Sequence, residues 1–266
     1  MTTSTTQSPP RPSPDRYLEL IAGDGERLAV VAEGQLDDPV PPCPGWDVAE
    51  VVRHTGSVYH HKVACIRLGR RPEEGEWQQS PPEGADLLDW YRDALAGILT
   101  ELSERKPDSP AYSWYPPEQD VAFWQRRMAQ ESVVHRVDAE SASGQVTPAD
   151  DELAVDGIDE VLDVFLRYGY SDNDVAADPD LDITRHAGRS VLVRTGPYAW
   201  HVAVASGEPE QIVLSREGGP AQATISGEPS ELLLWLWGRR PDGAVSIAGD
   251  PGAAAALRDL LSIATQ

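Results

Sequence analysis

The chain of 266 residues has little positive charge, with 22 Lys and Arg against 44 Asp and Glu and a formal net charge of −22. Lysine occurs only at Lys62 and Lys106. A surface this acidic repels a phosphate backbone, so we expect no nucleic-acid partner. Cysteine occurs only at Cys43 and Cys65, which excludes a disulfide framework and fits a reducing cytoplasm.

Long apolar runs are also missing from the sequence. No stretch approaches the roughly 20 apolar residues that a membrane helix needs, so we expect no membrane segment. Residues 1–14 are rich in Ser, Thr and Pro and lack the apolar region of a secretory signal. We therefore predict that residues 1–14 form a disordered tail and that the protein is cytoplasmic.

The chain up to about residue 170 has the periodicity of helices. Apolar residues recur at helical steps in five segments, namely residues 16–31, 47–70, 85–104, 119–141 and 148–168. Loops rich in Pro, Gly or polar residues separate these segments. The pattern predicts an all-α first domain over residues 15–170.

The period changes near residue 185. Short, partly alternating runs predict strands at residues 190–194, 199–205, 211–215, 221–226 and 244–248. Two apolar segments, residues 229–237 and 252–264, predict helices between and after them. We expect a small α+β domain over residues 185–266, joined to the first domain by an acidic linker at residues 171–184.

The fourth predicted helix has an inward face that carries ionisable groups. Four of its residues follow steps of 4, 3 and 4 and therefore share one face: Trp124, Met128, Glu131 and His135. Trp and Met indicate that this face points into the bundle. A buried carboxylate is costly unless it is paired, so Glu131 and His135 need partners.

His54 is the natural third member of this group. It lies on the second predicted helix, on a stripe with Val58, and so also points inward. Three N or O ligands with one open position are typical of catalytic zinc, and helix bundles place metal sites in their cores. We therefore predict that His54, Glu131 and His135 hold zinc or another divalent metal. Asp138, one turn after His135, is positioned to accept a hydrogen bond from its imidazole and fix the tautomer.

A plainer interpretation of these residues stays open. Glu and His four residues apart on a helix also form surface pairs or simple hydrogen bonds. His61, Trp124 and Met128 either line a pocket beside the metal or belong to the core and rim of the bundle. For Cys43, which stands between two prolines, we favour a packed apolar role over a metal ligand.

Three motifs resemble those of the mycothiol-dependent maleylpyruvate isomerase family, which belongs to the DinB-like metalloenzyme superfamily. Residues 42–56, PCPGWDVAEVVRHTG, resemble its Pro-Gly-Trp…His signature, and residues 124–139, WQRRMAQESVVHRVDA, resemble its second signature. Residues 232–239, LLLWLWGR, resemble a segment near the end of its C-terminal domain. The resemblance covers almost the whole chain after the tail, with the motifs in the expected order.

The resemblance implies a DinB-like four-helix bundle followed by a small α+β domain. It implies that His54, Glu131 and His135 hold a divalent metal, usually zinc, and that the thiol mycothiol is a cofactor or co-substrate. Arg239 falls where the C-terminal domain can offer a cation to an anionic substrate, although a helix-end cap explains it equally well.

The resemblance also implies a reaction class. We expect the enzyme to activate mycothiol for addition to a small electrophile, giving cis–trans isomerisation of the maleylpyruvate type or thiol S-transfer. Two alternatives stay open: a thiol-independent hydrolase that uses metal-bound water, and a non-catalytic metal- or thiol-binding sensor. We expect small-molecule partners and a monomer or homodimer.

Overall fold

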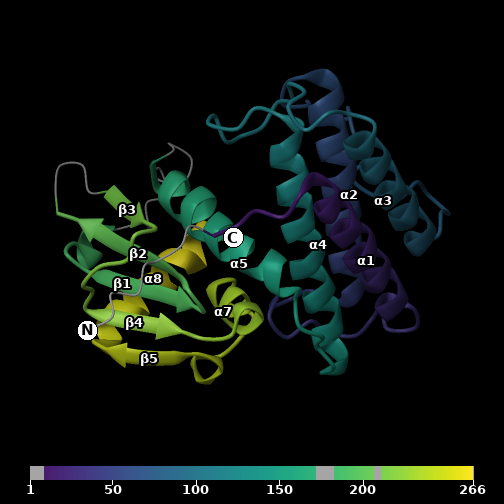
Figure 1. Cartoon of the computed structure of the whole chain (residues 1–266). Helices are drawn as coiled ribbons and strands as arrows, with labels where there is room; N and C mark the ends of the chain where they lie inside the picture. Colours follow the sequence, from purple (N-terminus) through teal and green to yellow (C-terminus); the bar gives the residue numbers. More distant parts are fainter. Residues whose placement is uncertain (1–8, 172–182, 207–210, 266) are drawn as a thin grey trace. The chain divides into compact units, whose positions relative to one another are not determined.

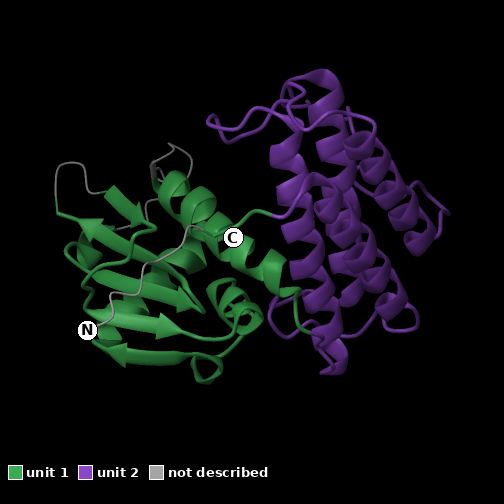
Figure 2. Cartoon of the chain, viewed as in Figure 1, with its two compact units in different colours: residues 1–11, 148–266 green, residues 12–147 purple. Residues whose placement is uncertain are grey.

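The computed structural model describes residues 9–171, 183–206 and 211–265. The chain forms two compact units, one of residues 12–147 and one that joins residues 148–266 to the segment before residue 12 (Figure 2). The sequence predicts this boundary at residue 170. The difference arises because helix α5 (Asp151–Glu160) packs against α7 (Pro229–Leu236), and Trp200 Nε1 donates to Asp159 Oδ1 at 3.0 Å.

The first unit is a bundle of four helices. These are α1 (Pro14–Ala32), α2 (Val48–Leu68), α3 (Leu87–Ser103) and α4 (Val121–Ser143). Both α1 and α2 pack against α3 and α4 (Figure 1). The predicted fold class is confirmed, because a helical N-terminal region precedes a small sheet domain.

Side-chain caps fix the limits of the two helices that matter most for function. At the start of α2, Asp47 accepts a hydrogen bond at 2.8 Å from the backbone N–H three residues on. Asp120 does the same at 3.0 Å for α4. Both helices end at a glycine with a left-handed backbone, Gly69 with φ 65° and Gly144 with φ 70°, a conformation that glycine adopts without steric cost.

The structure describes residues 9–14 of the predicted tail, and the predicted linker ends inside a described 3-10 helix, Ile183–His186. Helix α1 begins at Pro14, with the Ser13 hydroxyl capping its first turn, so the last residue of the predicted tail belongs to a helix. Residues 1–8, and residues 172–182 of the predicted linker, lie outside the described residues. Within the described segments, no helix is long and apolar enough to cross a membrane.

The second unit is built around a five-stranded sheet. The strands are β1 (Ser190–Thr195), β2 (Tyr198–Ala205), β3 (Gln211–Ser215), β4 (Ala223–Ser226) and β5 (Ser246–Gly249). Their order is β3-β2-β1-β4-β5, with β1 and β4 parallel and the other neighbours antiparallel. Helix α8 (Pro251–Ala264) packs against β1, β4 and β5.

The helices and strands of this unit follow the predicted segments to within two residues, apart from the helical region at α5. The last strand begins at Ser246, two residues later than predicted, because Asp242–Ala244 forms a 3-10 turn. Helix α5 continues as a π-helical segment over Val161–Tyr168, so one long helical region replaces the regular fifth helix that the sequence indicated.

Candidate metal centre

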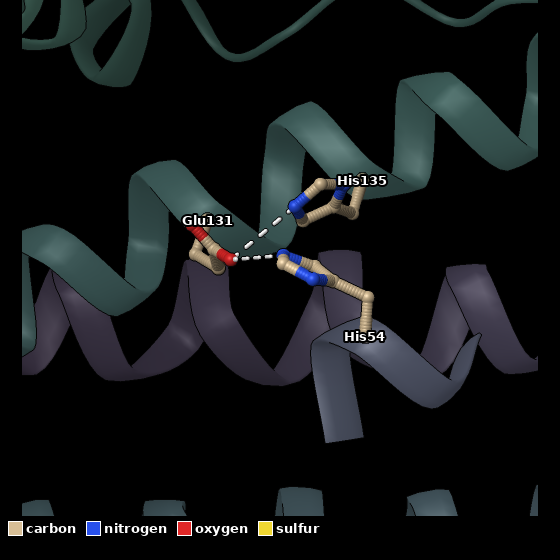
Figure 3. A group of neighbouring side chains, drawn as sticks. All are labelled: His54, Glu131 and His135. Atoms are coloured by element: carbon tan, nitrogen blue, oxygen red, sulfur yellow. Dashed lines mark ion pairs between the residues drawn. The ribbon is translucent and has the colours of Figure 1, made fainter. Parts of the chain in front are cut away.

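Three predicted ligands from two helices converge in the first unit (Figure 3). His54 projects from α2, and Glu131 and His135 project from successive turns of α4. One potential ligand atom of each residue lies within 4.8 Å of those of the other two. The spacing of four residues between Glu131 and His135 therefore places both side chains on one face, as the helical repeat requires.

The donor types and two of the three donor separations fit a zinc-type ion, and the separation of the two histidine donors is at most 4.8 Å. Glu131 Oε1 lies 3.4 Å from His54 Nε2 and 3.2 Å from His135 Nε2. Tetrahedral zinc with bonds of about 2.0–2.1 Å holds its ligand atoms about 3.3 Å apart. Two imidazoles and one carboxylate are also a common catalytic zinc donor set. The three residues could hold a divalent ion with small side-chain movements.

The cluster is closed on one side and open on the other. The side chains of Glu131 and His135 are only 14% and 10% exposed, whereas that of His54 is 41% exposed. The Trp46 ring lies beside His54, with centroids 5.2 Å apart. A ligand from solution would therefore approach the cluster from the side of His54, next to Trp46.

The motif around Trp46 is a tight turn held by its own backbone. Trp46 N donates to Cys43 O and Val40 N donates to Trp46 O, both at 3.0 Å. Gly45 has φ 87°, a value that L side chains rarely adopt. The Pro-Gly-Trp sequence thus sets the ring of Trp46 against His54. The Pro-Gly-Trp motif is visible in the sequence, but the contact of Trp46 with His54 depends on the fold of this turn.

Electrostatics keep Glu131 ionised. Burial by itself raises the pKa of Glu131, but the charge of His135 and hydrogen bonds with His135 and His54 hold it well below its usual range. Arg127 adds to this effect, because its Nη2 donates to Glu131 Oε2 at 2.8 Å. One carboxylate oxygen is thus held by Arg127 while the other faces the two histidines. Arg127 lies four residues before Glu131, a spacing visible in the sequence.

His135 lies between two carboxylates. Its Nδ1 lies 3.0 Å from Oδ2 of the fully buried Asp138, and its Nε2 faces Glu131. Burial favours the neutral ring, but the charge of Glu131 and the hydrogen bond with Asp138 raise the pKa of His135 to about 9. Without a metal, His135 is therefore an imidazolium at neutral pH. Asp138 orients the ring as the sequence indicated, with Nε2 directed toward Glu131.

The three residues predicted to line a pocket have different environments. Trp124 and Met128 are fully buried in the bundle core, and Trp124 Nε1 donates to the backbone oxygen of Tyr112 at 2.8 Å. His61 is only partly buried and packs edge-on against Trp77, with centroids 4.8 Å apart. Burial together with the charges of nearby cations lowers the pKa of His61 to about 4.

Arg239 belongs to the second unit. It lies just after α7, and its Nη1 donates to the backbone oxygen of Trp237 at 2.7 Å. This contact is the one that the helix-end interpretation of Arg239 describes. Its predicted action on a substrate stays a prediction.

Comparisons with known proteins give a consistent result over both units. Residues 20–140 match the family model of the mycothiol maleylpyruvate isomerase N-terminal domain, and residues 152–256 match the model of the C-terminal domain of the same enzyme. A search of curated proteins gives no match. Two crystal structures are similar, those of the mycothiol-dependent maleylpyruvate isomerase and of a point mutant of it.

The structural similarity extends over nearly all of both chains. The unmodified enzyme aligns with a TM-score of 0.57 and the mutant with 0.58, each at 11% sequence identity. In both cases the alignment covers 90% of this chain and 95% of the other. At this identity the similarity shows a shared fold.

Proposed function

We propose a function from the premise that this chain belongs to the mycothiol-dependent maleylpyruvate isomerase family. The chain acts as a mycothiol-dependent isomerase of a small electrophile, with zinc or another divalent ion held by His54, Glu131 and His135. The observation that supports this proposal is the convergence of these three side chains at 3.2–3.4 Å around Glu131 Oε1. When bound, such an ion lowers the pKa of a coordinated thiol, so that a thiolate is present at neutral pH.

The surrounding residues prepare the cluster for this role. Asp138 holds the Nδ1 side of the His135 ring and so directs Nε2 toward the metal position. Arg127 holds Glu131 Oε2 and leaves Oε1 to the metal position. The open side at His54 admits the thiol and the electrophile. The protein thus fixes three ligands and leaves space for exchangeable ones, which is the arrangement of a catalytic site rather than of a closed structural one.

The reaction follows from thiol chemistry. When bound, the thiol would supply a nucleophile for one carbon of a conjugated cis double bond, with the electron pair of that bond moving to the adjoining carbonyl. The former double bond would then be a single bond that can rotate, and expulsion of the thiolate would restore the double bond in the trans form. The thiol is regenerated, so no oxidant, reductant or second substrate is consumed.

The experiment that tests this proposal uses maleylpyruvate and zinc-loaded protein, with isomerisation followed by ultraviolet absorbance. We expect turnover only when both zinc and mycothiol are present. His135→Ala should lose zinc and activity together, because it removes one of three ligands. His201→Ala, a histidine change in the second unit, is the matched control and should keep both.

Three outcomes would contradict parts of the proposal. Full zinc occupancy in His135→Ala would exclude His135 as a ligand. Turnover without thiol would favour metal-bound water as the reacting group. A stable thiol conjugate in place of the trans isomer would show S-transfer rather than isomerisation.

A further inference from the structure

A lysine that the proposed chemistry does not use lies between the two helices that carry the candidate metal centre. Lys62 lies on α2, eight residues after His54. Its Nζ lies 5.2 Å from the centroid of the Trp124 ring and 3.1 Å from His61 Nδ1. Glu131 is near enough for its charge to act on Lys62. The ammonium group therefore lies between side chains of α2 and α4, the two helices that carry the metal cluster.

The contacts of Lys62 are those of a cation with capacity for another ligand. Among the described residues, no carboxylate lies within 4.0 Å of Lys62 Nζ, and its one hydrogen-bond partner is His61. An ammonium group has three N–H donors, so two remain for a ligand or water. The low pKa of His61 keeps that ring neutral at pH 7, so Nδ1 can accept the hydrogen bond from Lys62.

Burial and neighbouring cations destabilise the charged form of Lys62 unless an anion is bound beside it. Burial lowers the pKa of Lys62, and Arg127 and Arg71 lower it further, while Cys65 and Glu131 act in the opposite sense. The carboxylate of Glu131 is already shared between Arg127 and the two histidines. A partly buried cation that lacks an ion pair gains most from an anionic ligand.

We propose that Lys62 binds a carboxylate of the electrophilic substrate and thereby places its double bond at the metal centre. This inference rests on the proposed function and deepens it by assigning a residue that positions the substrate. Lys62, with Arg71 and Arg127, supplies local positive charge in a chain whose net charge is −22, which is the condition for drawing in an anion. The Trp124 ring stabilises the ammonium by a cation–π contact.

The composition of the chain allows a direct test without any substitution. Only two lysines are present, Lys62 and the exposed Lys106. Protein labelled with ¹³C at lysine Cε therefore gives two side-chain signals, which are followed by NMR while maleate is added to zinc-loaded and to metal-free protein. We expect a saturable shift of the Lys62 signal and none of the Lys106 signal. Dimethyl maleate, which has no carboxylate, should shift neither signal. Equal shifts of both lysines, or no shift of Lys62 with maleate, would overturn the proposal.

Substitutions test the same site through turnover. Lys62→Met keeps the apolar stem and removes the charge, and should raise KM for maleylpyruvate at least tenfold with a smaller change in kcat. Lys62→Arg should restore most of the loss, whereas Lys106→Met should change nothing. An unchanged KM in folded, zinc-loaded Lys62→Met would contradict the proposal.

The two proposals fail in different ways. If maleate shifts the Lys62 signal but no thiol-dependent isomerisation occurs, the proposed function is wrong and the carboxylate site stands. If isomerisation occurs with normal KM in Lys62→Met, the function stands and the role of Lys62 is wrong.

Discussion

Zinc binding at the candidate centre should release a proton from His135. The pKa of His135 gives the cost of this release to the free energy of zinc binding. The contacts of His135 with Glu131 and Asp138 raise its pKa to about 9 in the metal-free protein. Zinc binds only the neutral ring, so the proton at Nε2 must leave. At pH 7, about two units below this pKa, only about one molecule in a hundred has the neutral ring, which weakens zinc binding by about 3 kcal/mol.

The expected result is a zinc affinity that rises steeply with pH. Between pH 6 and 8 the apparent Kd should fall about tenfold per pH unit because of His135 alone, and this contribution should level off above about pH 9. Glu131 contributes no proton, because its pKa already lies well below its usual range. Chelator competition at several pH values gives the slope, and calorimetry in buffers of different ionisation enthalpy gives the number of protons released.

The raised pKa of His135 also determines how the stability of the metal-free protein changes with pH. The folded-state pKa of His135 is above the usual value of 6.5, so the folded state binds this proton more tightly than the unfolded state does. The resulting stability is complete below about pH 6.5 and is lost as the pH rises toward 9. A zinc Kd that does not change between pH 7 and 8, with no proton release, would refute this account of His135.

Three further predictions concern neighbouring residues. Asp138→Asn should weaken zinc binding by about 10- to 100-fold in chelator competition, because the orienting partner of His135 is lost; unchanged affinity would contradict it. Gly56→Ala should lower the free energy of unfolding in urea by about 1–3 kcal/mol, since the new Cβ would lie 2.4 Å from Trp90 Cζ3; an unchanged midpoint would refute it. His61 should titrate near pH 4 by NMR, and stability should fall as the pH drops from about 6.5 to 4 because the unfolded state binds that proton first.

The order and type of the regular elements could be predicted because their periodicity is local. Alternating and helical patterns identified the four bundle helices and the five strands to within a few residues. The domain boundary could not be predicted in this way. The apolar stripe of α5 shows that the helix has a buried face, but not that this face meets α7 rather than the bundle. That choice depends on contacts between residues far apart in the chain.

The candidate site shows the same division between local and long-range information. Glu131 and His135 are four residues apart on one helix, so the sequence predicts that both side chains share a face. The apolar stripe of the second predicted helix indicates that His54 points inward. The identity of the metal stays a prediction. The position of Lys62 over Trp124 depends on how α2 and α4 pack. The only sequence signal for Lys62 was the scarcity of lysine in the chain.

The measurement that tests the central claim most directly is a calorimetric titration of zinc-loaded protein with mycothiol, with His54→Ala as the control. We predict saturable binding to the wild-type protein that is lost in His54→Ala, because His54 is one of the three ligands that present the metal to the thiol. No binding to the zinc-loaded wild-type protein, or equal binding to His54→Ala, would contradict the assignment of this cluster as a metal centre that activates a thiol.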